Sequence, residues 1–90
     1  MLLGRKTARE RIATFLLMLA RREVRIGRSA NALRLTMTRT DIADYLGLTT
    51  ETVSRTFTSF KKRGWIELDS GNAVMLCNPD ALEDLAVGLD

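Results

Sequence analysis

The sequence contains no histidine, and it has a single cysteine, Cys77, among its 90 residues. These two shortages exclude an intrachain disulfide and leave too few ligands for a zinc site or for histidine-based catalysis. The sequence also lacks a glycine-rich phosphate-binding loop and a nucleophile with a base beside it. We therefore expect no enzyme activity, no metal and no cofactor.

Long hydrophobic runs are missing as well. The longest apolar run, residues 12–20, is interrupted by Thr14 and is too short to span a bilayer. Basic residues precede apolar ones near the start, but Glu10 interrupts them and no small-residue cleavage site follows, which argues against a signal peptide. The length, with 46% hydrophobic and 28% charged residues, predicts one small cytoplasmic globular domain with no membrane partner.

Basic residues are absent from residues 64–90, where six acidic residues give a charge of −6. All 14 Lys and Arg residues lie in residues 1–63 together with five acidic ones, so that segment carries +9. Such a segment is typical of proteins that bind nucleic acid or an anionic membrane, but an unevenly charged solvated surface has the same pattern. Charge alone leaves these interpretations open.

Capping residues and hydrophobic periodicity predict the first elements. Thr7 followed by Glu10 is a capping box, and it opens a helix over residues 7–22 in which apolar residues recur at helical spacing. Residues 33–37 then alternate between apolar and polar side chains. That alternation has the period of a short strand with one buried face.

Two further helices are predicted on either side of a glycine turn. Thr38 caps a short helix, residues 39–46, and Gly47 stands where a helix end favours a positive φ. Thr49 caps a longer helix, residues 49–63. Its buried face is predicted to hold Val53, Phe57 and Phe60, and its outward face Glu51, Ser54, Arg55, Thr58 and Lys62.

The remaining residues predict a hairpin and a last helix. Residues 65–68 and 73–76 flank a turn cluster that contains a glycine, and Pro79 follows Asn78 at the first position of a helix. Helix, strand, helix, tight turn, helix and hairpin together predict a winged helix-turn-helix domain, mainly α with a small antiparallel β wing. The second helix of such a pair enters the major groove of DNA.

Residues 38–68, TRTDIADYLGLTTETVSRTFTSFKKRGWIEL, resemble the helix-turn-helix and wing of the cyclic-AMP receptor and fumarate-nitrate regulator (Crp/Fnr) family of bacterial transcription factors. The sequence ETVSR, directly after a D-I-A-x-x-L-G-L helix and turn, is the specific part of the match. Upstream, LLGRKTARERIATFLLMLARR resembles the end of the dimerisation helix of that family, a hinge, and the first helix of its DNA-binding domain.

The resemblance implies a domain plan and partners. Residues 1–6 would be the end of the dimerisation helix and the hinge, and residues 7–90 the winged helix-turn-helix DNA-binding domain. The chain would then be the output domain of a larger regulator that is a homodimer and has a sensor domain elsewhere. The loop over residues 27–33 corresponds to the family region that can touch RNA polymerase.

Three outward residues of the helix 49–63 are candidates for reading DNA bases. The fork of the Arg55 guanidinium matches the O6 and N7 acceptors of guanine, and Glu51 can accept a hydrogen bond from the N4 amino group of cytosine. Ser54 is small enough for close approach to a base or a thymine methyl. The alternative is an exposed Glu51–Arg55 pair worth ~0.3 kcal/mol, and the motif favours base reading over it.

Thr50 is a fourth candidate for base reading, and it bears on which sequence is read. Family members of the cyclic-AMP receptor type have Arg before the Glu and recognise TGTGA, whereas those resembling the fumarate-nitrate regulator recognise TTGA. Thr50 cannot supply a second bidentate guanine contact. The resemblance therefore implies TTGA-like half-sites in an inverted repeat.

Candidate phosphate contacts lie near the N-termini of the same two helices, where hydroxyls, a guanidinium and free backbone N–H groups can bind anions. They are Thr38, Arg39, Thr49 and Thr52, of which Thr38 and Thr49 are first of all helix caps. The wing tip, residues 69–72, has one acid and no base, so we expect its contact with DNA to be weak.

Two further interpretations come from single residues and from the fold class. Cys77 is expected to be a buried small hydrophobe rather than a redox switch. A winged helix can also bind proteins through the same helix, so a protein-interaction module without sequence-specific DNA binding is the competing function. The outward residues Glu51, Ser54 and Arg55 and the basic segment favour DNA.

Overall fold

The helices of the protein begin where their capping residues predict. A computed structural model describes residues 6–27, 32–69 and 73–88. Thr7 accepts a hydrogen bond from the backbone N–H of Glu10, whose carboxylate accepts one from Thr7 in return, so the predicted capping box is present. The side chains of the other three caps also accept a backbone N–H at the start of their helices: Thr38, Thr49 and Asn78.

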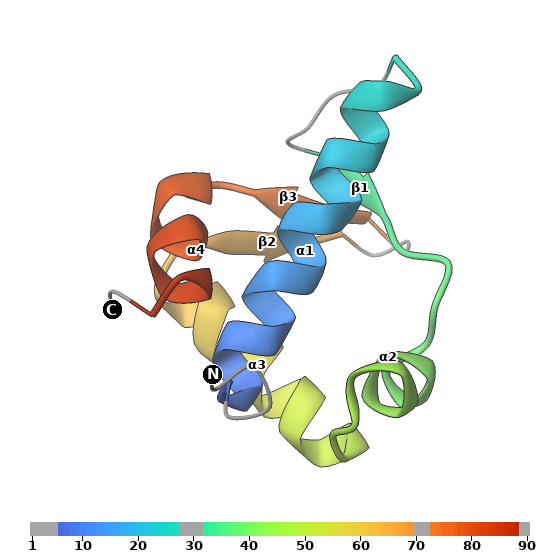
Figure 1. Ribbon diagram of the computed structural model, residues 1–90, viewed down its shortest axis with the longest axis vertical. Helices are drawn as coiled ribbons and strands as arrows, with labels where there is room; N and C mark the ends of the chain where they lie inside the picture. Colours follow the sequence, from blue (N-terminus) through green and yellow to red (C-terminus); the bar gives the residue numbers. More distant parts are fainter. Residues whose placement is uncertain (1–5, 28–31, 70–72, 89–90) are drawn as a thin grey trace.

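The order of the elements is the predicted one (Figure 1). The helices and strands are α1 (Ala8–Arg25), β1 (Ala32–Arg34), α2 (Arg39–Leu46), α3 (Thr50–Lys62), β2 (Ile66–Leu68), β3 (Ala73–Leu76) and α4 (Pro79–Ala86). The three strands form one antiparallel sheet in the order β1-β3-β2, in which Leu33 pairs with Val74 and Leu68 with the same residue from the other side. The predicted wing hairpin is therefore confirmed for the described residues.

Two boundaries differ from the prediction by more than one residue. α1 continues to Arg25, three residues beyond the predicted end at Arg22, because charged helix formers extend it after the apolar pattern has stopped. The predicted strand over residues 33–37 ends at Arg34, which pairs with Ala73, the first residue of β3. Leu35 is still buried, so the apolar alternation continues to pack without strand pairing.

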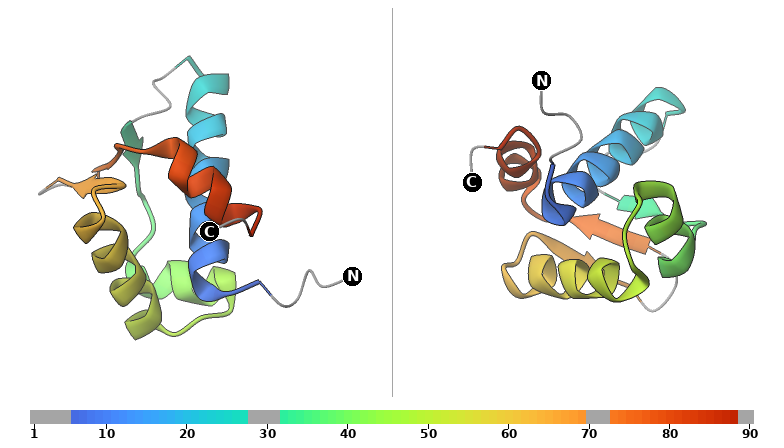
Figure 2. Two further views of the ribbon diagram at one scale, coloured as in Figure 1. Left: turned by 90° about the vertical axis from the view of Figure 1, so that its left-hand side faces the viewer. Right: turned by 60° about the horizontal axis from the view of Figure 1, so that its bottom comes forward.

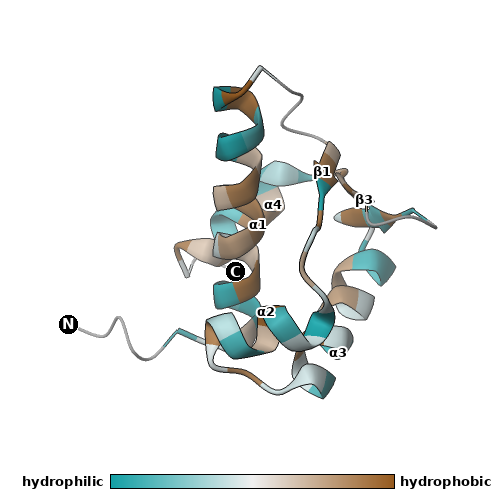
Figure 3. Ribbon diagram, turned by 90° about the vertical axis from the view of Figure 1, so that its right-hand side faces the viewer, coloured by the Kyte–Doolittle hydropathy of each residue, from teal (hydrophilic) through white to brown (hydrophobic). Residues whose placement is uncertain are grey.

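The core lies between α1, the sheet and the other helices. Its largest fully buried side chains come from every helix and from the sheet: Phe57, Phe60, Ile12, Leu16, Leu33, Ile42, Ile66, Leu82, Val53 and Val74. α4 and α2 lie on opposite sides of α1, as Figures 1 and 2 both show. Figure 3 shows α2 and α3 mostly in teal and pale shades, since their apolar residues occupy a narrow stripe.

Cys77 corrects one expectation. It is exposed rather than buried, because Val74 and Leu76 point into the core and the alternation of the strand puts Met75 and Cys77 on the outer side. Trp65 packs against α3: its ring lies 5.4 Å from that of Phe60, centroid to centroid.

None of the helices in the described ranges combines the length and the hydropathy that a membrane crossing requires.

Candidate nucleic-acid interface

The interface is built on the turn that joins α2 to α3. Gly47 ends α2 in the left-handed conformation, with φ of 72°, which the sequence pattern predicts. The N–H groups of Gly47 and Leu48 both donate to the carbonyl of Ala43, the latter at 2.8 Å. Thr49 then caps α3 at once, so the two helices are joined by three residues with fixed backbone partners.

The outer face of α3 presents the predicted base-reading residues to solvent. Glu51, Ser54 and Arg55 are all exposed, and so are Thr58 and Lys62 further along. The opposite face is buried and holds Val53, Thr56, Phe57 and Phe60. The buried and exposed faces that helical periodicity predicted for α3 are therefore confirmed.

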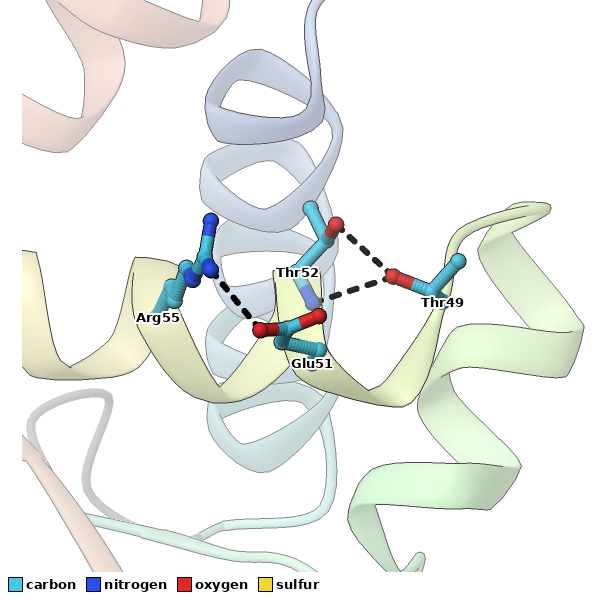
Figure 4. A network of polar contacts seen from close by, with 4 residues as sticks. All are labelled: Thr49, Glu51, Thr52 and Arg55. Carbon is cyan, nitrogen blue, oxygen red and sulfur yellow. Dashed lines mark hydrogen bonds and ion pairs between the residues drawn. The ribbon is translucent and has the colours of Figure 1, made fainter.

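Glu51 and Arg55 form an ion pair one helical turn apart. Arg55 Nη2 donates to Glu51 Oε2 at 2.7 Å, and their side chains are 72% and 77% exposed for Glu51 and Arg55 respectively (Figure 4). At this exposure the pair contributes only about 0.3–0.5 kcal/mol to stability. The pair and a base-reading role are compatible, because an exposed guanidinium exchanges partners at little cost.

Threonine hydroxyls gather at the N-termini of α2 and α3. The hydroxyl of Thr49 donates to that of Thr52 at 2.8 Å and accepts the backbone N–H of Thr52 at 3.1 Å (Figure 4). Thr50 donates to the hydroxyl of Thr40 at 3.3 Å, which connects the start of α3 to the first turn of α2. Thr38 caps α2 through Asp41. The structure thus joins Thr49 to Thr52 and Thr50 to Thr40, whereas Thr38 bonds within its own capping box.

Arg39 is held rather than free in solvent. Its guanidinium carbon lies 4.2 Å from the centre of the Phe57 ring, so the first residue of α2 stacks on the buried face of α3. Partial burial lowers the pKa of the Arg39 guanidinium from its ordinary value, because desolvation disfavours the charged form. No pattern in the sequence predicted this stacking.

Three predicted features fall partly or wholly outside the described residues. The wing tip is described only at Asp69, which is exposed, and residues 70–72 lie outside. The loop that was assigned to RNA polymerase is likewise cut by residues 28–31, and the hinge by residues 1–5. Within the described ranges, no group of three or more Cys, Asp or Glu residues could hold a metal ion.

A short helix, a glycine turn and a longer helix with a polar outer face, beside a small antiparallel sheet, define a winged helix-turn-helix domain. The family described as Crp-like helix-turn-helix domain matches residues 10–85. The chain therefore belongs to this family.

Relatives agree with this assignment. The chain is 51% identical over 86 residues to the nitrogen fixation regulation protein FixK of Azorhizobium caulinodans, covering 94% of this chain and 35% of FixK. It is 46% identical over 86 residues to the fumarate and nitrate reduction regulatory protein of Escherichia coli, covering 96% of this chain and 34% of that protein. The chain thus spans about a third of the length of the curated relatives it matches.

A solved structure agrees with the family assignment. FixK2 from Bradyrhizobium japonicum superposes with a TM-score of 0.81 at 45% identity, over 93% of this chain and 40% of that one. The relatives are named as regulators and transcriptional activators, not as enzymes.

Proposed function

We propose that this chain binds double-stranded DNA in a sequence-specific way through α3, as the output domain of a bacterial transcription regulator. The observation that carries the proposal is the exposed row of Glu51, Ser54 and Arg55 on the first half of α3, directly after the helix-turn-helix turn. The N-terminal residues of a recognition helix are those that meet base edges in the major groove.

The proposed preference is for TTGA-like half-sites. Arg55 would bind the O6 and N7 atoms of the guanine, Glu51 would accept from the cytosine paired with it or with its neighbour, and Ser54 would contact a thymine. Thr50 stands before Glu51 and already bonds to Thr40, and its short side chain offers no bidentate fork for a further guanine.

Phosphate contacts are proposed for the threonines and the arginine around this helix pair. Thr38, Thr49 and Thr52 stand at helix N-termini, where unpaired backbone N–H groups favour an anion. Arg39 supplies a positive charge that Phe57 holds in place, which lowers the entropy lost when it binds a phosphate. These contacts would set the register of α3 without reading sequence.

The larger protein is proposed to be a cytoplasmic homodimer. Residues 1–6 would join a dimerisation helix to the winged helix-turn-helix domain of residues 7–90, and the loop at residues 27–33 would face RNA polymerase. Two copies of α3 would then read an inverted repeat whose half-site centres are about one helical turn apart.

Selection from a random DNA pool, with the chain fused to a dimerising segment, tests the proposal. The expected product is a palindrome with TTGA-like halves, whose affinity falls steeply as salt is raised. A pool that stays random would contradict sequence-specific binding. If the chain also shows no salt-dependent binding to DNA in a gel-shift assay, the result favours the competing function of a protein-interaction module.

A further inference from the structure

Arg11 lies on α1, yet its guanidinium reaches the end of α2. Its Nη1 atom donates a hydrogen bond of 2.9 Å to the backbone carbonyl of Leu46, which is 35 residues away in the chain. The bond is partly buried, and Arg11 itself is half-buried. It therefore connects the first turn of α1 to the last residue of α2.

The Leu46 carbonyl is at a place where a helix needs an outside donor. The last four carbonyls of a helix have no partner within the helix, and a positive charge nearby is favourable. In α2 the carbonyl of Ala43 takes the N–H groups of Gly47 and Leu48, and the last turn of this helix has no basic residue. Arg11 supplies both the donor and the charge from α1.

The guanidinium also lies against the turn itself. A Cβ atom built on Gly47 would be 3.5 Å from Arg11 Nη1, which is ordinary van der Waals contact. Beside this contact, the rings of Phe15 on α1 and Tyr45 on α2 have their centroids 5.8 Å apart. The turn that sets the direction of α3 is thus held from one side by α1.

The end of α1 that carries Arg11 is itself anchored. Lys6, just before α1, donates through Nζ to the carbonyl of Ala86 at 2.7 Å, which caps the C-terminal end of α4. α1 and α4 pack against each other (Figure 2). Arg11 therefore acts from a fixed point of the fold.

We propose that Arg11 is a positioning residue for the recognition helix: by holding the carbonyl before the helix-turn-helix turn, it fixes the orientation of α3 relative to α1. Arg11 does not touch DNA in this proposal. It acts through the turn on Glu51, Ser54 and Arg55. The inference rests on the proposed function for its effect on DNA, and on the geometry alone for its effect on the turn.

Three variants separate positioning from charge and from packing. Arg11→Met keeps most of the stem but removes the donor and the charge. Arg11→Lys keeps a donor and the charge. Arg21→Met removes the same charge from an exposed position on the same helix. If circular dichroism shows that Arg11→Met does not fold, Arg11→Gln takes its place. The glutamine side chain is shorter and neutral, so it does not reach the Leu46 carbonyl.

The DNA readout is the ratio of two affinities, measured by fluorescence anisotropy at low salt for a TTGA duplex and a scrambled duplex of equal length. We expect Arg11→Met to lower this ratio about fivefold, because a charged donor to a partly buried carbonyl is lost, while Arg11→Lys and Arg21→Met stay within about twofold. An unchanged ratio in Arg11→Met, even with lower thermal stability, would overturn the proposal. So would an equal loss in Arg21→Met.

Nuclear magnetic resonance of the free protein is the second readout. Arg11→Met should move the amide signals of Gly47, Leu48 and Thr49, and Arg11→Lys should restore them. If the unmodified chain shows no preference between the duplexes, the proposed function fails on its own, and the amide signals then decide whether Arg11 holds the turn. Unmoved signals would overturn that part too.

Discussion

Arg55→Ala separates base reading from a mere surface ion pair, because the two interpretations differ greatly in magnitude. In the free protein Arg55 pairs with Glu51 at 2.7 Å, with both side chains more than two-thirds exposed. Losing such a pair costs about 0.3–0.5 kcal/mol, and alanine is a good helix former that recovers part of it. The melting temperature should therefore fall by no more than about 3 °C.

On DNA the same substitution should have a far larger effect. A bidentate contact with guanine is worth about 1–3 kcal/mol of discrimination per half-site, which is about 5- to 150-fold in affinity. On a palindrome the loss occurs in both half-sites and adds for well-separated positions. Selectivity at the guanine of TTGA should relax at the same time, because the group that distinguishes it is gone.

The assay is competition between palindromes with TTGA and TTAA half-sites, which differ only at the guanine that Arg55 would bind, at one salt concentration, with the chain fused to a dimerising segment. Arg55→Lys serves as the matched control, since it keeps the charge and loses the planar fork. The unmodified protein should prefer TTGA, and both variants should lose that preference. Unchanged selectivity in Arg55→Ala would refute base reading. An equal loss on every duplex would make Arg55 a phosphate contact instead.

Four further expectations concern Arg39, the unfused chain, Gly47 and Cys77. Arg39→Ala should weaken binding to all sequences alike and lower the salt slope by about one, measured by titration at several salt concentrations; a sequence-dependent loss would contradict a phosphate role. The unfused chain should sediment as a monomer and bind a palindrome about 10²-fold more weakly than the fused dimer; a tight dimeric chain would contradict the need for a tether. Gly47→Ala should lower the free energy of unfolding in urea by about 1 kcal/mol, because φ is 72° while the Cβ itself has room; an unchanged midpoint would disprove this strain. Cys77 should react with a maleimide in the folded protein nearly as fast as in urea, since it is exposed; mass spectrometry showing protection would contradict that.

The elements with strong local signals could be predicted to the residue. α2 has a capping box at Thr38 and a glycine at its end, and its observed bounds are the predicted ones. α4 begins at Pro79 for the same kind of reason. The end of α1 and the length of β1 depend on which partners are within reach, so hydrophobic pattern alone placed them wrongly.

Some features of the candidate site could likewise be predicted from the sequence, and others could not. The outward row of α3 follows from helical periodicity, so it could be read from the sequence. The stacking of Arg39 on Phe57, the Thr50–Thr40 bond and the reach of Arg11 to Leu46 could not, because each joins two different elements. Cys77 was predicted to be buried because free cysteines usually are, although the alternation of β3 indicates an outward-facing side chain.

The place of α4 has a consequence for how the domain meets a polyanion. The exposed acids of this helix, Asp80, Glu83 and Asp84, lie on the opposite side of α1 from α2 (Figure 1). Together with the basic residues of the segment 1–63, these acids make the charge of the domain uneven, and under the proposed function the field of a nucleic acid would exert a torque on it before contact. Encounters that lead with α4 would then be repelled, while those that lead with the helix-turn-helix would be drawn in. The domain would approach a nucleic acid already oriented, and a higher ionic strength would first remove that gain in the association rate.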